Sequence, residues 1–143
     1  MYVPFPLENM TISNFDDLLQ AARTQAQPQR LLFVFVGVEL PDDSTPEESE
    51  RFREGQGGAL VPLMCVDKRP DELTSFEQLV QESRQFGQQW GIVFAAALSG
   101  QSNQAPTSEA AEAPLQRMVE AIKRGDHGAF IPFDQNGQPV QFG

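Results

Sequence analysis

The chain has 143 residues, of which 40% are hydrophobic and 21% are charged. A chain of this length and composition is expected to fold as one domain with a packed core, which excludes an intrinsically disordered protein. The formal net charge is −10. We expect no binding to nucleic acid or to anionic membranes, because an acidic protein repels their phosphate groups.

The chain contains a single cysteine, Cys65, so no intramolecular disulfide can form. This is typical of a protein of the reducing cytoplasm. The first ten residues, MYVPFPLENM, lack the basic start and long apolar run of a signal peptide. The longest apolar runs, LLFVFVGV and GIVFAAAL, are shorter than the ~20 residues that a membrane span needs. We therefore expect a cytoplasmic protein without a membrane segment.

The first predicted helix belongs to a repeated segment. Residues 12–23, ISNFDDLLQAAR, align without a gap with residues 73–84, LTSFEQLVQESR. In both segments apolar residues recur at intervals of three and four, which predicts an amphipathic helix. Ser13 and Thr74 each lie three residues before an acidic residue, the spacing of a capping box, and are the predicted N-caps.

A continuous apolar run follows each of these helices. Residues 31–40, LLFVFVGVEL, align with residues 91–100, GIVFAAALSG. Such runs predict strands that are covered on both faces. A second helix is predicted in each half. The first opens near Pro46, since proline is tolerated in a first turn, and the other spans residues 108–124 with an apolar stripe of Leu115, Met118, Val119 and Ile122.

A glycine- and proline-containing phrase closes each half: GALVPL at 58–63 returns as GAFIPF at 128–133. A further glycine lies three residues earlier in each case, at Gly55 and Gly125, and glycine is favoured just after a helix C-terminus. The prolines of the phrase, Pro62 and Pro132, cannot donate to a sheet, so they predict strands at an edge or a bulge.

Short strands are predicted at both ends of the chain. The segment FDQNGQPVQF predicts a terminal hairpin with a type I′ turn at Asn136 and Gly137. The segment YVPF at residues 2–5 resembles the repeated phrase, and we expect it to pair as a short edge strand.

These elements predict an α/β fold, with α+β as the alternative. Residues 1–143 form one domain in which two tandem αβαβ repeats, approximately residues 11–68 and 72–143, share one mixed sheet flanked by helices, with a C-terminal β-hairpin. We expect the two apolar strands at the centre, the proline-containing strands outside them, and helices covering the central strands.

The sequence predicts no catalytic residue, metal ligand or cofactor. His127 is the single histidine and is predicted to be an exposed turn residue, because no GxSxG nucleophile motif accompanies it. Cys65 lies between Met64 and Val66 and is predicted to be buried in the core. One cysteine and one histidine do not form a zinc site of recognised spacing. The segment GQGG follows a helix and precedes a strand, the reverse of a phosphate-binding loop.

Three residues are candidates for ligand binding: Arg23, Arg84 and His127. The two arginines end equivalent helices, where a cation interacts favourably with the helix dipole. Alternatively, they form a paired-arginine anion site where the two halves meet.

Two functions are therefore predicted from the residues. The first is a non-catalytic binding or interaction module, whose partner is an unknown protein or a second copy bound through an edge strand. The alternative is a small-molecule or anion-binding regulator, or a minor enzyme, with a site between the two halves.

Three blocks, QRLLFVFVGVELPDD, GGALVPLMCVDK and APLQRMVEAIKRGDHGAFIPFD, resemble a family of short bacterial proteins of unassigned function. Its members are often labelled ribonucleotide reductase subunit alpha, which implies the reductase or a regulator of it. The reductase large subunit is a much larger barrel that uses a reducible cysteine pair, a radical cysteine and a glutamate. Cys65 alone does not supply this set, so no reductase residue or activity is assigned. A shorter resemblance, VPL…DELTSFEQL, is to the enhanced-serine-sensitivity family.

Overall fold

The computed structural model describes residues 2–3, 14–39, 45–53, 59–87 and 89–140. In chain order they form β1 (Tyr2–Val3), α1 (Phe15–Arg23), β2 (Gln29–Glu39), α2 (Pro46–Arg53), β3 (Ala59–Lys68), the 3₁₀ helix η2 (Pro70–Glu72), α3 (Phe76–Arg84), β4 (Ile92–Ser99), α4 (Ser108–Lys123) and β5 (Ile131–Phe133). The predicted α/β class and the αβαβ order of each half are both present. Within these ranges no helix is long and apolar enough to cross a bilayer.

The strands form one sheet in the order β1-β4-β2-β3, and β5 also pairs with β4. The two apolar strands are therefore central and the proline-containing strands lie outside them, as predicted. β1 pairs with β4, so the predicted N-terminal edge strand is present at Tyr2–Val3.

The prediction of a mixed sheet is wrong, because every pair of described strands is antiparallel. β2 and β3 are direct antiparallel neighbours, and α2, which lies between them in the chain, does not cover a face of the sheet. A parallel pair would have needed a crossover connection over the sheet.

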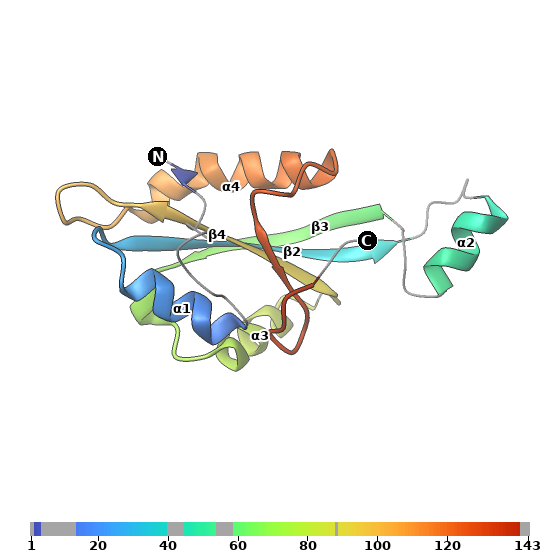
Figure 1. The fold of residues 1–143 in the computed structure, drawn as a ribbon, viewed down its shortest axis with the longest axis horizontal. Coiled ribbons are helices and arrows are strands. Elements are labelled where there is room, and N and C mark those ends of the chain that lie inside the picture. The colour runs from blue at the N-terminus through green and yellow to red at the C-terminus, as the bar shows by residue number, and fades with distance from the viewer. Residues whose placement is uncertain (1, 4–13, 40–44, 54–58, 88, 141–143) are drawn as a thin grey trace.

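The two central strands are buried on both faces. Residues 31–36 of β2 and 93–98 of β4 are all at most 2% exposed. One set of alternating side chains packs with α1 and α3, and the other set packs with α4. Figure 1 shows α4 on one side of the sheet and α1 and α3 on the other. An uninterrupted apolar run is what such a three-layer arrangement requires.

The first helices of the two halves match each other closely. α1 begins at Phe15 and ends at Arg23, while α3 begins at Phe76 and ends at Arg84, so both bounds are 61 residues apart. This spacing is that of the aligned segments in the sequence.

The N-caps of these helices lie one residue later than predicted, at Asn14 and Ser75. Each side chain accepts a hydrogen bond from the backbone N–H three residues further on, at 2.9 Å and 3.3 Å. Thr74 instead bonds the side chain of Gln78, and Ser13 lies outside the described residues. The phenylalanine after each cap is buried and is the first residue of its helix. The N-cap is the residue directly before the helix, so it is Asn14 or Ser75 and not the residue before that.

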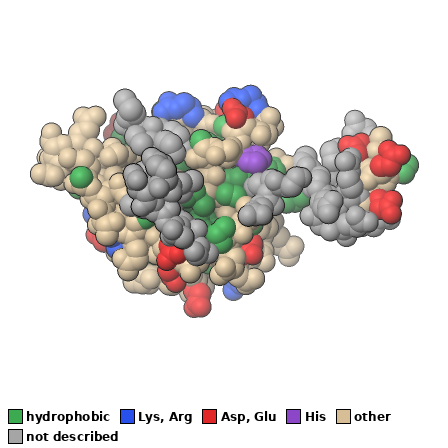
Figure 2. Space-filling view, in the orientation of Figure 1, with side chains coloured by type: hydrophobic (Ala, Val, Ile, Leu, Met, Phe, Trp, Pro, Cys, Tyr) green, Lys and Arg blue, Asp and Glu red, His purple; other side chains and the backbone are tan. Residues whose placement is uncertain are grey.

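α2 does not cover the sheet, contrary to the expectation that helices flank both halves. Figure 1 shows it standing apart beyond the ends of β2 and β3, and Figure 2 shows acidic side chains gathered on it. Its sequence, PEESERFR, has one large apolar residue. It therefore lacks the apolar stripe that α4 buries against the sheet.

Gly125 ends α4 as predicted, with a φ of +79°. The Asp126 N–H donates to Ala121 O at 2.8 Å, and the Gly125 N–H donates to Ile122 O at 3.0 Å. These are the two bonds of a Schellman motif. Gly55, the counterpart in the first half, lies outside the described residues.

The C-terminal hairpin is present, but its turn differs from the prediction. Phe133 and Pro139 form an antiparallel bridge, and the Gly137 N–H donates to Asp134 O at 3.1 Å. Gly137 has a φ of +77°, whereas Asn136 has no positive φ. A type I′ turn needs positive φ at both residues, so this is a type I turn followed by a left-handed glycine.

Candidate functional site

The structure separates the two arginines that the sequence paired. Arg23 Nη2 donates to Leu73 O at 2.8 Å and to Pro70 O at 3.3 Å, just before α3 begins. Arg84 is the last residue of α3, about 12 Å along the helix axis from Phe76 at 1.5 Å per residue. The guanidinium of Arg23 is thus bound to backbone carbonyls, and the two residues do not form one anion site.

His127 lies on the opposite face of the sheet from both arginines. Its ring is 5.2 Å from that of Phe94, which belongs to the core under α4. The side chain is half-buried, whereas the sequence predicted an exposed turn residue. The three predicted ligand-binding residues therefore do not converge on one site.

Cys65 is exposed, so its assignment to the core was wrong. It lies on the outermost strand between Met64 and Val66, which pack against the core under α1 and α3. Since alternate residues of a strand point to opposite faces, Cys65 is directed away from that core. Partial burial and the nearby Asp67 carboxylate raise the pKa of the Cys65 thiol, which lowers its reactivity at neutral pH.

β3 carries a free sheet edge. Among the described residues it pairs with β2 and with no other strand. Residues 64–68 pair in regular register with residues 31–35 of β2, and the register shifts between Phe35 and Val36, where Pro62 is the partner. The bulge and the proline disrupt the beginning of the strand. A regular edge, Met64–Lys68, remains.

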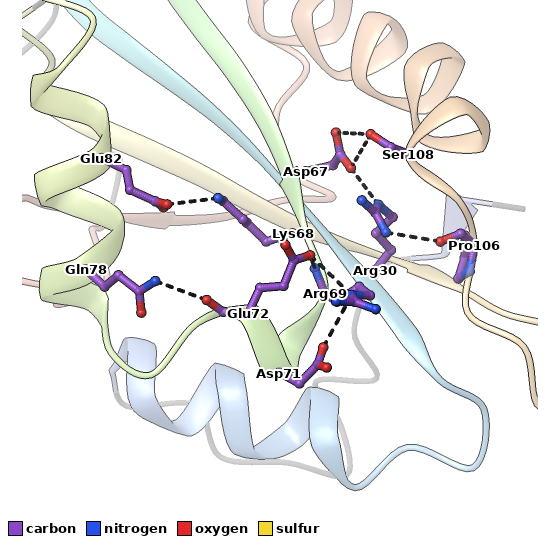
Figure 3. A network of polar contacts seen from close by, with 10 residues as sticks. All are labelled: Arg30, Asp67, Lys68, Arg69, Asp71, Glu72, Gln78, Glu82, Pro106 and Ser108. Atoms are coloured by element: carbon purple, nitrogen blue, oxygen red, sulfur yellow. Dashed lines mark hydrogen bonds and ion pairs between the residues drawn. The ribbon is translucent and has the colours of Figure 1, made fainter.

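Two polar clusters fix the end of this edge, as Figure 3 shows. On one face, the Asp67 carboxylate accepts hydrogen bonds from Arg30 Nε at 2.5 Å and from Ser108 Oγ at 2.8 Å. On the other face, Lys68 Nζ lies 3.0 Å from Glu82 Oε1. The edge is thereby attached to α4 on one side and to α3 on the other.

A cavity of about 150 Å³, here called the side pocket, lies between the edge of β3 and α3. It is lined by Phe35, Val66, Lys68, Leu79, Glu82, Ser83, Gln85 and Phe86. Phe86 is 58% exposed, which is unusual for a side chain of this size in the protein. Glu82 Oε2 is a buried atom without a hydrogen-bond partner among the described residues.

A larger cavity of about 810 Å³, here called the end cleft, lies at the C-terminal end of α3. Both halves of the chain line it, through Gly37, Val38, Leu63, Val80, Arg84, Gln89, Trp90, Gly91 and Gln135. Of the predicted candidates, Arg84 is the one that borders this cleft.

Trp90 lines the end cleft and contacts two residues of the side pocket. Its indole Nε1–H donates to Ser83 Oγ at 2.8 Å, and its ring meets that of Phe35 edge-on at a centroid distance of 5.0 Å. Ser83 and Phe35 line the side pocket, while Trp90 lines the end cleft. The indole is 5% exposed.

The sequence did not reveal the side pocket. Phe86 continues the three- and four-residue spacing of the buried residues of α3, so its pattern is that of a core residue. Its exposure follows from the end of the helix at Arg84, which turns the next residues away from the sheet. Nor does spacing along the chain relate Lys68 to Glu82, which meet only after β3 and α3 have packed.

Comparisons with protein-family models, with curated proteins and with solved structures find no match to this chain. The two family resemblances of the sequence therefore stay expectations. In the ranges that the structure describes, no group of three or more His, Cys, Asp or Glu residues is placed to hold a metal ion.

Proposed function

We propose that this chain is a non-catalytic binding module that takes up an extended peptide segment of a partner protein along β3. The observation that carries the proposal is the position of the side pocket directly beside the regular, unpaired edge Met64–Lys68. In strand addition, main-chain hydrogen bonds to a sheet edge supply affinity, and adjoining pockets for side chains supply specificity.

The edge is preorganised for such a partner. The ion pair of Lys68 with Glu82 and the hydrogen bonds of Asp67 hold its end on both faces of the sheet. A fixed edge loses little conformational entropy when a peptide pairs with it, which leaves more of the interaction energy for binding.

The side pocket selects an apolar side chain. Phe35, Val66 and Leu79 supply apolar walls, and the exposed ring of Phe86 adds apolar surface at the pocket. A cavity of about 150 Å³ holds a group the size of benzene. The unpaired Glu82 Oε2 would accept a hydrogen bond from a donor on the same peptide.

A second copy of this chain is a weaker occupant. Two β3 edges pairing with each other would satisfy the free backbone groups. However, Met64 and Val66, the apolar side chains that β3 directs to the face of the side pocket, already pack against the chain's own core. A peptide accounts for both the edge and the pocket.

The test is selection of peptides from a random displayed library against the full chain, followed by amide hydrogen exchange on the complex. We expect slowed exchange within residues 64–68. Phe86→Ala should weaken peptide binding about tenfold or more, equivalent to at least about 1.4 kcal/mol. The matched control is Val38→Ala, which removes an exposed apolar side chain from the end cleft and should leave peptide affinity unchanged.

Three results would overturn the proposal: no peptide is selected, the selected peptides protect other strands, or Phe86→Ala binds as well as the wild type. Protection of residues 64–68 without peptide, appearing with rising protein concentration alongside a dimer in light scattering, would assign the edge to a second copy instead. Circular dichroism establishes that both variants are folded.

A further inference from the structure

We infer that the end cleft is a separate binding site for a small monocarboxylate with an apolar body, held through Arg84. This inference does not rest on the proposed peptide site, because the two cavities share no lining residue.

The size and the walls of the cleft fit such a ligand. A volume of about 810 Å³ lies within the range of roughly 300–1,000 Å³ that is typical of small-molecule sites. Leu63, Val80 and Trp90 supply apolar surface. Val38 lines the same cleft and is 37% exposed. Of the large hydrophobic side chains in the described ranges, Val38 and Phe86 are the exposed ones, and each borders one of the two cavities.

Arg84 supplies the charge. It is exposed on the last turn of α3, and its guanidinium has no hydrogen bond or ion pair with any described residue, although the chain has twice as many acidic as basic residues. By contrast, the guanidinium of Arg23 is occupied by two backbone carbonyls. An unpaired guanidinium presents parallel N–H donors that match the two oxygens of a carboxylate.

Contacts between separate segments of the chain hold the walls of the cleft together. Gln135 Nε2 donates to the carbonyl of Trp90, which ties the C-terminal turn to the cleft wall. Gly37 lies against the Leu63 side chain, and a Cβ built on it would be 3.4 Å from Leu63 Cδ1. The walls come from separate segments, yet contacts between those segments hold their positions.

A carboxylate is favoured over a phosphate by charge. Arg84 is the one Lys or Arg side chain among the described residues that line the cleft, so it balances one negative charge. The net charge of −10 repels a multiply charged anion more strongly than a monoanion.

The chain provides its own probe, because Trp90 is its single tryptophan and lines the cleft. Tryptophan emission, excited selectively, is followed while phenylacetate is added to the full chain. We expect a saturable change with phenylacetate and none with phenylacetamide, which has the same shape without the charge. Inorganic phosphate at matched ionic strength should neither change the emission nor compete.

Variants separate the site from a general charge effect. Arg84→Gln should weaken phenylacetate binding about tenfold or more, and Val38→Asn should weaken it as well. Arg124→Gln removes an equal charge at the end of α4, on the opposite face of the sheet, and should bind like the wild type.

The inference is overturned if phenylacetate gives no saturable response, if phenylacetamide or phosphate binds equally well, or if Arg84→Gln leaves the affinity unchanged. Thermal unfolding of each variant establishes that the cleft is folded. Phe86→Ala should bind phenylacetate normally, so failure of the peptide site and failure of the cleft are distinguishable.

Discussion

Val34 of β2 lies directly opposite Phe94 of β4 in the sheet, and the same two residues align when the sequence is compared with itself. When two aligned strands pair antiparallel, the residues that align in the sequence lie opposite each other at one point, and that point marks a two-fold axis between the strands. α1 and α3 pack on the same face of the sheet. A two-fold rotation between the halves would give these two features, but it does not relate α2 to α4, since α4 packs on the sheet and α2 stands apart from it.

Replacing Phe94 by alanine should strongly destabilise the fold. The ring is 0% exposed and packs in the core under α4. Large-to-small changes of buried phenylalanine cost about 3–5 kcal/mol. Urea unfolding measures the loss. The control is Phe86→Ala, where an exposed ring is removed and the free energy of unfolding should change by less than about 0.5 kcal/mol. Equal losses in both variants would mean that Phe94 is not in the core.

Asp67→Asn should lower the free energy of unfolding by about 1–3 kcal/mol, because Arg30 loses a charged partner at a half-buried position. Asp71→Asn is the matched control. Asp71 lies 3.6 Å from Arg69 with a side chain that is 74% exposed, and such surface pairs contribute little. Chemical denaturation of both variants checks the contrast, and an unchanged midpoint in Asp67→Asn would contradict the role of this carboxylate.

Gly100→Ala should destabilise the fold by about 1–3 kcal/mol or more. A Cβ built at this position would lie 2.0 Å from Gln104 O and 2.8 Å from Pro28 O, so backbone segments would have to move. Gly128→Ala is the control, since nothing lies within 4 Å of its Cβ position. The free energy of unfolding of that variant should be unchanged or higher by about 0.4–1 kcal/mol, because alanine reduces the conformational entropy of the unfolded chain. Thermal unfolding that ranks the variants in the opposite order would contradict the close approach at Gly100.

The Cys65 thiol should react with iodoacetamide more slowly than an unstructured cysteine at neutral pH. Burial and the charge of Asp67 raise its pKa, so less thiolate is present. The alkylation rate should therefore rise only above the usual pH range, and Asp67→Asn should shift the profile slightly downward. Because the folded protein holds this proton more tightly than the unfolded chain, its contribution to stability is lost as the pH rises through the folded pKa. A pH profile that coincides with that of a model peptide would contradict the shift.

The sequence was sufficient for the helices and for which strands are central and which are outer, but not for the full strand order or the strand directions. A strand with one face in water alternates apolar and polar residues. The runs at 31–36 and 93–98 contain no polar residue, which predicts strands at the centre of the sheet that are covered on both faces. Pro62 and Pro132 lack the backbone N–H that a residue of an interior strand donates to a neighbouring strand. The strands that contain them were therefore predicted to be outer strands. These constraints act within a few residues and are readable from spacing.

What the sequence did not predict depends on contacts between distant segments. Arg23 and Arg84 end equivalent helices, yet one guanidinium meets backbone carbonyls before α3 and the other meets a cleft. Cys65 has apolar neighbours in the chain, but its exposure depends on the face of β3 on which it lies and on what covers that face. The position of α2 depends on how much apolar surface this eight-residue helix can bury against the sheet, and its sequence contains one large apolar residue.

The hydrogen bond from Trp90 to Ser83 joins a wall of the end cleft to a wall of the side pocket. A molecule that pushes the indole from one side changes the shape offered on the other side. Thermodynamic linkage then requires each ligand to alter the affinity of the other by the same factor. With both cavities occupied, the peptide and the carboxylate would report on each other through a single side chain.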